Sequence, residues 1–350
     1  MIHGCEHAVT RLRLGIKVHY NNGVSHTRQG REPCIFLPCR FYYTVGIMVE
    51  EGAVREQILA LKEERDAVIL AHNYQVDEVQ EIADIVGDSL ELSRAAASLE
   101  HATIVFCGVD FMAETAAILS PEKTVLLPAA DACCPMAEMV NAGELEVLCS
   151  RFPDAAVVAY VNTTAEVKAV SDICCTSANA VKVVESLSET QVIVVPDRNL
   201  ARYVARFTTK EIIPWEGYCI VHERFTPEDV RRERALHPSA EVLVHPECRP
   251  EVIDCADHVF STSGMIRHVC TSPSGEFIIG TEIGILHGLS RKCPEKRCYP
   301  LSNRAICINM KKTDLPKVCA ALERMEPQIR VPERTAEPAR RAIERMLAVR

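Results

Sequence analysis

From residue 54 onward, the chain alternates between short apolar runs and longer stretches of helical period. Val54, Ile58, Leu59 and Leu61 lie on one face of a helix, and a continuous apolar run follows at 67–71. Apolar runs of this length predict strands, and the amphipathic stretches between them predict helices. We expect strands at 67–71, 103–107, 124–127, 155–159, 191–195, 241–244, 258–260 and 277–280. We expect helices at 79–97, 110–119, 198–207 and 227–236.

The predicted strands are apolar throughout, and helical stretches separate them. Both features are typical of parallel sheets with helices on both faces, because such strands are buried on both sides. The pattern therefore predicts an α/β protein. In parallel sheets, ligands bind beyond the carboxyl ends of the strands, so these ends are the expected location of a site.

Polar residues follow three of the predicted strands in a similar way. The runs are HNY at 72–74, YVN at 160–162 and HPE at 245–247. From residue 72 to 160 is 88 positions, and from 160 to 245 is 85. Small hydroxyl residues near predicted helix starts repeat with the same two spacings, at Ser89, Ser177 and Thr262. Two features with one pattern of spacings indicate a threefold internal repeat.

The hydroxyl residues suggest what the repeat binds. A helix N-terminus presents unpaired N–H groups and the positive end of the helix dipole, which favour carboxylate or phosphate. A single hydroxyl at such a position usually only caps its helix. Three in register, each near a polar strand end, indicate a shared anionic ligand at the centre of the three units.

Cysteines follow the same period. Cys134, Cys219 and Cys307 are separated by 85 and 88 positions, which gives one cysteine per unit. Three thiolates leave one open position on a tetrahedral zinc ion or on a [4Fe–4S] cluster. Structural zinc usually takes paired C-x₂₋₄-C ligands, and none of these three cysteines has such a partner. The spacing alone leaves the metal open.

Composition excludes several classes of protein. The 350 residues are 48% apolar and 25% charged, which is ordinary for a globular chain of two or three domains. A net charge of −9 argues against a nucleic-acid partner, although a local cationic pocket for a small anion stays open. No apolar run approaches the roughly 20 residues that span a bilayer. Seventeen cysteines without a secretory signal pattern predict a cytoplasmic protein whose thiols are mostly small core residues.

The first 47 residues differ from the rest. They carry six Lys or Arg residues against Glu6 and Glu32, and they show no sustained periodicity. We expect this leader to be poorly ordered and dispensable, with Met48 as the true start of the protein. A transit peptide is the alternative, although Ser25 is the leader's single serine.

Eight sequence blocks carry a resemblance to a known family. They are LAHNYQ, DIVGDSLELSR, GVDFMAETA, AYVNTTAEVKA, TSANAV, PDRNLARYVA, VHPECRPEV and STSGMI. With the three cysteines, they resemble the quinolinate synthases of bacteria and archaea over roughly residues 54–350. The resemblance implies three similar αβα modules with short parallel sheets in a pseudo-threefold arrangement around a central site. The implied modules are 48–135 with 308–350, 136–220, and 221–307.

The resemblance also implies an activity and a cofactor. Members of the family condense iminoaspartate with dihydroxyacetone phosphate to give quinolinate for NAD biosynthesis, with loss of phosphate and water. A [4Fe–4S] cluster on Cys134, Cys219 and Cys307 would leave one iron free as a Lewis acid. An aspartate oxidase or dehydrogenase would be a coupled supplier of iminoaspartate. The implied substrate-binding residues are His72, Tyr74, Ser89, Tyr160, Asn162, Ser177, His222, His245, Glu247, Ser261 and Thr262.

These residue types suit the implied chemistry. Glu247 is the expected general base, because enamine–imine shifts and ring closure need several proton transfers. The histidines can hydrogen-bond substrate oxygens or move protons near neutral pH, and the tyrosines offer phenol donors. The hydroxyls at helix starts suit carboxylate and phosphate groups. We therefore expect catalytic roles for Glu247, His72, Tyr74, Tyr160, His222 and His245.

Some alternatives remain open at this point. Cys133 beside Cys134 leaves the first ligand ambiguous by one residue, and Cys293 with Cys298 is a candidate regulatory disulfide. A hydro-lyase of the aconitase kind would need a C-x-x-C pair, and a radical enzyme would need C-x₃-C-x₂-C; the chain has neither. An iron–sulfur redox sensor without turnover is the alternative from another class.

Overall fold

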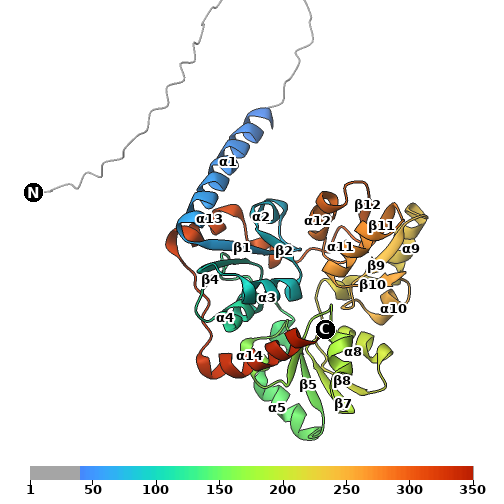
Figure 1. Ribbon diagram of the computed structural model, residues 1–350. Helices are drawn as coiled ribbons and strands as arrows, with labels where there is room; N and C mark the ends of the chain where they lie inside the picture. Colours follow the sequence, from blue (N-terminus) through green and yellow to red (C-terminus); the bar gives the residue numbers. More distant parts are fainter. Residues whose placement is uncertain (1–39, 350) are drawn as a thin grey trace, which may run out of the picture. The chain divides into compact units, whose positions relative to one another are not determined.

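Three parallel sheets organise the protein, and the computed structural model describes residues 40–349 of it (Figure 1). Each sheet has four strands, and every pairing is parallel. The first sheet, in the order β2-β1-β3-β4, contains β1 (Ala67–His72), β2 (Ile85–Gly87), β3 (Thr103–Cys107) and β4 (Thr124–Leu126). The second, in the order β6-β5-β7-β8, contains β5 (Ala156–Tyr160), β6 (Ile173–Cys175), β7 (Gln191–Val195) and β8 (Glu211–Pro214). The third, in the order β10-β9-β11-β12, contains β9 (Glu241–Val244), β10 (His258–Val259), β11 (Glu276–Gly280) and β12 (Arg297–Pro300).

Helices connect and cover these strands, so the predicted α/β class with three αβα modules is confirmed. In chain order they are α1 (Arg40–Glu64), α2 (Asp77–Ile82), α3 (Ser89–Ser98), α4 (Asp110–Leu119), α5 (Ala142–Arg151), α6 (Ala165–Ala169) and α7 (Ala180–Glu185). They continue with α8 (Arg198–Val204), α9 (Pro227–Leu236), α10 (Pro250–Ile253), α11 (Thr262–Thr271), α12 (Ile285–Lys292), α13 (Leu315–Arg324) and α14 (Glu333–Ala348). None of the helices in the described part of the chain combines the length and the apolar character needed to cross a bilayer.

Sequence patterns located the central strands and two edge strands, β4 and β10, but missed the other four edge strands. The eight predicted strands are present within one residue of their expected bounds, whereas β2, β6, β8 and β12 were not predicted. These four strands are only three or four residues long, so they lack the longer apolar run that identifies a buried strand. The single helix expected at 79–97 was wrong, because β2 divides that stretch into α2 and α3. The helix expected at 198–207 ends at Val204 and continues as a 3₁₀ turn.

An aspartate before the edge strand repeats in all three sheets. Its backbone N–H donates to a carbonyl of the neighbouring central strand, and its carboxylate accepts the N–H of that same residue. The pairs are Asp84 with Ile69, Asp172 with Val157, and Asp257 with Val242, with N–H to carboxylate distances of 2.8, 2.7 and 2.7 Å. Their spacings are the 88 and 85 positions seen in the sequence. The repeat therefore extends to individual hydrogen bonds.

The chain ends with two helices that pack in different places. Leu315, Val318 and Leu322 of α13 join a buried cluster with Ile58 of α1 and Ile69 of β1. By contrast, α14 packs against α6, β6 and α4, where Ile343 and Met346 are fully buried. The segment 308–350 thus contacts both the first and the second sheet. Residues 1–39 of the predicted leader lie outside the described part of the chain.

Candidate active site

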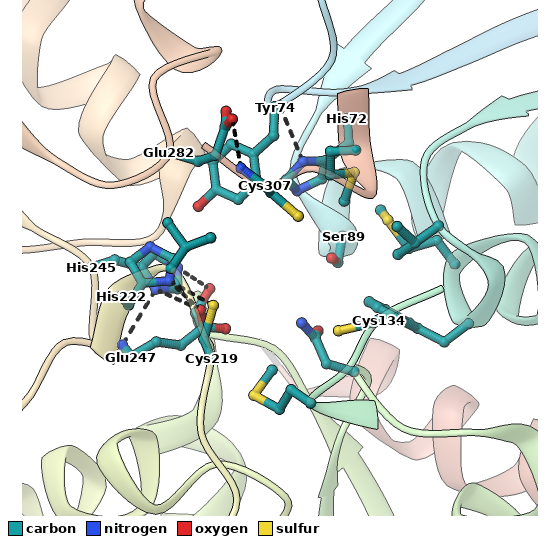
Figure 2. Close-up of a pocket in the computed structure, with 18 of the residues that line it drawn as sticks. His72, Tyr74, Ser89, Cys134, Cys219, His222, His245, Glu247, Glu282 and Cys307 are labelled. Atoms are coloured by element: carbon teal, nitrogen blue, oxygen red, sulfur yellow. Dashed lines mark hydrogen bonds and ion pairs between the residues drawn. The ribbon is translucent and has the colours of Figure 1, made fainter. Parts of the chain in front are cut away.

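A single pocket collects the carboxyl ends of strands from all three sheets (Figure 2). His72 ends β1, Tyr160 ends β5, and His245 directly follows β9. The pocket therefore lies where parallel sheets are expected to bind ligands. Its lining contains the predicted residues His72, Tyr74, Ser89, Cys134, Tyr160, Asn162, Ser177, Cys219, His222, His245, Glu247, Thr262 and Cys307. Ser261 does not line it, because its hydroxyl caps α11 and donates to Asp88.

The three predicted cysteine ligands face this pocket from three modules. Cys134 follows β4, Cys219 follows β8, and Cys307 follows β12, and their sulfur atoms lie around the same open space in Figure 2. None of the three is in a disulfide. Burial raises the pKa of all three thiols, so the thiolate forms need a cation beside them. Three partly buried cysteines whose sulfur atoms surround one cavity fit an iron–sulfur group.

Cys133 also lines the pocket beside Cys134. It is partly exposed, as is the Cys134 residue as a whole. The Cys134 carbonyl accepts the N–H of Ala137, which begins a 3₁₀ turn, at 2.9 Å. The choice between the two neighbouring thiols therefore stays a prediction in favour of Cys134.

Glu247 lies at the centre of an acid–base network. Its side chain is 5% exposed and its Oε1 accepts the hydroxyl of Tyr160 at 2.6 Å. The Oε2 atom is 2.7 Å from Nδ1 of His222 and 3.6 Å from Nδ1 of His245. Burial raises the pKa of Glu247, but the two histidines and the tyrosine outweigh that effect and hold the pKa below its usual range. Glu247 is therefore ionised, and the Tyr160 hydroxyl and Nδ1 of His222 are within hydrogen-bond distance of its two oxygens.

The network continues through a residue that the sequence did not reveal. Nε2 of His222 lies 2.8 Å from Oγ1 of Thr281, and the Tyr74 hydroxyl lies 2.5 Å from the same oxygen. Thr281 is 1% exposed, and it joins two predicted residues from different modules. A chain of hydrogen bonds thus runs from Tyr74 through Thr281 and His222 to Glu247. Because threonine is common in loops, only the structure could identify Thr281.

His72 and His245 repeat one local geometry. In each, Nδ1 accepts the backbone N–H of the second residue further along, Tyr74 at 3.2 Å and Glu247 at 3.3 Å. This bond fixes the tautomer, so that Nε2 carries the proton. Nε2 of His245 then donates to Oγ of Ser177 at 3.1 Å. Burial lowers the pKa of both histidines to about 3, so both are neutral at pH 7.

The hydroxyl residues occupy different local positions. Ser89 and Thr262 are the first residues of α3 and α11, as expected. Ser177 lies upstream of α7, whose N-cap is Asn179, so the expected helix start was wrong in the second module. Thr262 accepts a hydrogen bond from the amide of Asn73 at 2.9 Å, a second contact between modules that the sequence did not reveal.

Two features of the lining favour a small polar ligand. Oδ1 of Asn162 is buried without a hydrogen-bond partner, so it is free to accept from a ligand. The lining contains no Lys or Arg, so a cationic side chain does not neutralise an anion there. An anionic ligand would instead be bound by hydroxyls, amides, Nε2–H groups and a bound metal. Cys219, His222 and Glu247 also lie close enough together to share one cation.

The candidate regulatory disulfide was assigned to the wrong pair. Cys293 is bonded to Cys270, and their Cα atoms are 5.4 Å apart. Cys298 is a free thiol in β12. Because Cys270 lies in α11, 23 positions before Cys293, its proximity could not be predicted from local spacing.

The fold and the site define a class of protein: a threefold-repeated parallel α/β enzyme whose pocket joins three thiols to an acid–base network. The family model described as "Quinolinate synthetase A protein" matches residues 56–348. The chain therefore belongs to the quinolinate synthase family, which depends on an iron–sulfur group, and the resemblance seen in the motifs is confirmed.

Relatives that are named quinolinate synthases are similar to this protein over most of its chain. It is 67% identical to a quinolinate synthase of Methanoregula boonei, across 86% of this chain and 100% of the relative. Quinolinate synthases of Dehalococcoides mccartyi and Geobacter sp. strain M21 are each 55% identical, across 85% of this chain and 98% of the relative.

Proposed function

We propose that this chain condenses iminoaspartate with dihydroxyacetone phosphate to form quinolinate, with loss of phosphate and water. The observation that carries the proposal is the single pocket that holds the three cysteines together with Glu247, Tyr160 and the histidines. A [4Fe–4S] cluster on Cys134, Cys219 and Cys307 would supply an iron with an open coordination position, which acts as a Lewis acid. The module boundaries, cytoplasmic location and coupling to an aspartate oxidase or dehydrogenase belong to the same proposal.

Binding of the substrates follows from the donors in the pocket. The Nε2–H group of His72 and the hydroxyls of Ser89 and Thr262 suit carboxylate and phosphate oxygens. The free Oδ1 of Asn162 suits an amine or imine N–H of iminoaspartate. Because the lining has no Lys or Arg, dianionic groups would be held by many neutral donors rather than by an ion pair.

Proton transfer is assigned to Glu247 and its neighbours. Glu247 takes protons from carbon or nitrogen of the joined substrates, and Tyr160 and His222 donate to its two oxygens. The bonds from His222 to Thr281 and from Thr281 to Tyr74 give a path along which a proton can move away from Glu247. His72 and His245, neutral at pH 7, act as hydrogen-bond donors.

Anaerobic enzyme supplied with iminoaspartate and dihydroxyacetone phosphate tests the proposal. An aspartate oxidase in the same mixture generates the short-lived imine, and quinolinate is measured by chromatography. About four iron and four sulfide per chain are expected together with turnover. A protein that holds iron and sulfide, binds dihydroxyacetone phosphate and forms no quinolinate would instead be a metabolite sensor.

A further inference from the structure

Behind two of the cysteines, a buried carboxylate holds the backbone. The N–H of Cys219 donates to Oδ2 of Asp197 at 3.1 Å, and the N–H of Cys307 donates to Oε1 of Glu282 at 3.1 Å. Asp197 and Glu282 are both fully buried. Each carboxylate uses its other oxygen on nearby backbone: Asp197 caps α8 by accepting the N–H of Leu200 at 2.7 Å, and Glu282 accepts the N–H of Gly284 at 2.7 Å.

The first module has an equivalent carboxylate, Asp110. Its Oδ1 accepts the backbone N–H of Phe111 at 2.8 Å. The three acidic residues occupy the same place in the fold, two or three positions after β3, β7 and β11. They are separated by 87 and 85 positions, so they follow the internal repeat. In the second and third modules, this carboxylate beyond the third strand reaches the cysteine loop beyond the fourth strand.

Burying a carboxylate destabilises the folded protein unless hydrogen bonds or a nearby charge compensate for its lost hydration. A buried carboxylate loses its hydration. Two backbone N–H groups compensate in part for Asp197, whereas Glu282 also forms an ion pair with Nζ of Lys311 at 3.1 Å. An apolar side chain would leave the cysteine N–H without an acceptor, and the loop could then turn its thiol away. Residues behind metal ligands commonly orient those ligands in this way.

We propose that Asp197 and Glu282 are positioning residues that hold the backbones of Cys219 and Cys307, so that these two thiolates meet the thiolate of Cys134 at one cluster. This inference rests on the proposed cluster but not on its catalytic activity. It explains how three loops from different modules can present their thiols to a group that none of them could bind alone.

Asp197 offers the sharpest test, because both of its oxygens accept N–H groups. In Asp197→Asn one oxygen becomes an NH₂ group, which faces an N–H donor whichever way the amide turns. Asp172→Asn is the matched control: Asp172 accepts the N–H of Val157 in the same module, before the edge strand rather than behind a cysteine.

The experiment measures iron release from anaerobic holoenzyme to an excess of a chromophoric chelator. Loss of such an orienting group typically weakens metal binding by about 10–100-fold, so we expect iron release from Asp197→Asn to accelerate by that factor. The thermal midpoint and circular dichroism should match those of Asp172→Asn, whose release rate should stay at the wild-type value. The visible absorption of the cluster should also shift in Asp197→Asn alone.

Release from a folded Asp197→Asn at the wild-type rate would overturn the proposal. If that variant does not fold, Glu282→Gln decides by the same two outcomes. Because the readout is iron release, an enzyme that makes no quinolinate would refute the proposed function and leave this test intact.

A different cluster of ligand atoms lies at the other end of the third sheet. Glu241 begins β9, His258 begins β10, and His268 lies in the last turn of α11. Oε2 of Glu241 is 2.7 Å from Nε2 of His268 and 3.4 Å from Nε2 of His258. Ser272 donates to the other carboxylate oxygen at 3.1 Å, which orients the carboxylate. The three side chains are 22–39% exposed, so a hydrated ion can reach them.

The spacing of these atoms suits a tetrahedral ion. Zinc bonds of about 2.0–2.1 Å place neighbouring ligand atoms about 3.3 Å apart. The observed separations bracket that value, and two imidazoles with one carboxylate match the preferences of zinc. The geometry points to a second metal site on Glu241, His258 and His268 for a borderline divalent cation such as Zn²⁺, with water in the fourth position.

Zinc counting on iron-loaded, anaerobic protein tests this site. After equilibrium dialysis against low-micromolar Zn²⁺, wild-type protein should hold one more zinc per chain than His268→Ala or His258→Ala. His237→Ala, a change of a histidine stacked on Tyr299, is the control and should match wild type. Equal zinc in all four proteins would refute the site. If His268→Ala does not fold, His258→Ala decides, because His258 is the most exposed of the three.

Discussion

The Tyr160 hydroxyl donates to Oε1 of Glu247 at 2.6 Å, and this bond joins the second module to the third inside the pocket. Both residues are 4% exposed. The carboxylate raises the pKa of the tyrosine, in addition to the larger effect of burial, so Tyr160 stays protonated and donates. The pair therefore places a fixed donor and a basic oxygen on the same side of the pocket.

Replacing Glu247 by Gln should separate chemistry from binding. Glutamine keeps the shape and one accepting oxygen but cannot take a proton. General-base catalysis is typically worth about 10²–10⁴-fold, so turnover should fall by a factor of that order. Single-turnover assays with anaerobic spectra measure the effect, and the iron content should match wild type. Turnover of Tyr160→Phe should fall less than that of Glu247→Gln, because this change removes a hydrogen-bond donor but leaves the base. Near-normal turnover of Glu247→Gln would move the base to a tyrosine or histidine.

Thr281→Val should interrupt the path between Tyr74 and His222. Valine has the shape of threonine but lacks the oxygen, which leaves a phenol and an imidazole nitrogen without partners. An unsatisfied buried group costs about 1–3 kcal/mol, so kcat should fall about tenfold. Thr281→Ser restores the oxygen and should recover most of the activity. Equal kcat values for the valine and serine variants would show that the hydroxyl has no role in turnover.

The sequence revealed the features that repeat along the chain. It did not reveal strands and residues whose role depends on a contact with a distant part of the chain. Thirteen of the fourteen predicted site residues line the pocket, because strand ends and cysteines recur at fixed spacings, and Ser261 is the exception. Strands β2, β6, β8 and β12 were missed because a three- or four-residue strand is stabilised by its neighbour rather than by its own pattern. Asp197 and Glu282 also follow the period, but acidic residues are common enough that only their bonds to the cysteine loops single them out.

Changing Cys134, Cys219 or Cys307 to Ser should remove the intact cluster in each case, because two thiolates hold it poorly. Iron and sulfide counting after anaerobic purification measures this result. Cys107 and Cys149, free thiols outside the pocket lining, are the controls, and their Ser variants should keep full iron. Cys133→Ser should also keep its iron. Loss of iron from Cys133→Ser but not from Cys134→Ser would shift the first ligand by one residue.

A shortened protein that begins at Met48 should fold and turn over like the full chain. Val54, Ile58 and Leu61 of α1 pack against α13 and β1. Because these contacts all lie beyond residue 48 and remain in the shortened protein, the thermal midpoint should change by no more than about 2 °C, the effect of a surface change. Differential scanning calorimetry, iron counting and the quinolinate assay check the three properties. Failure to fold would give the leader a structural role.

Acid should destabilise the fold through His72 and His245. Their folded pKa of about 3 lies below the value of about 6.5 in an unfolded chain. Below pH 6.5 the unfolded chain therefore binds more protons than the folded protein at these two histidines. The free energy of unfolding has its full value above pH 6.5 and decreases as the pH falls from 6.5 toward 3. Each group contributes a slope of about 1.4 kcal/mol per pH unit within that window.

The variants His245→Gln and His72→Gln/His245→Gln separate these contributions. Urea unfolding at pH 7.5, 6.5 and 5.5, on protein freed of iron so that acid loss of metal plays no part, gives the slope of unfolding free energy against pH. The single variant should lose about 1.4 kcal/mol per pH unit of that slope below pH 6, and the double variant about twice as much. Unchanged slopes in both variants would mean that the two imidazoles accept protons in the folded protein. They could then act as cations toward the substrate rather than as neutral donors.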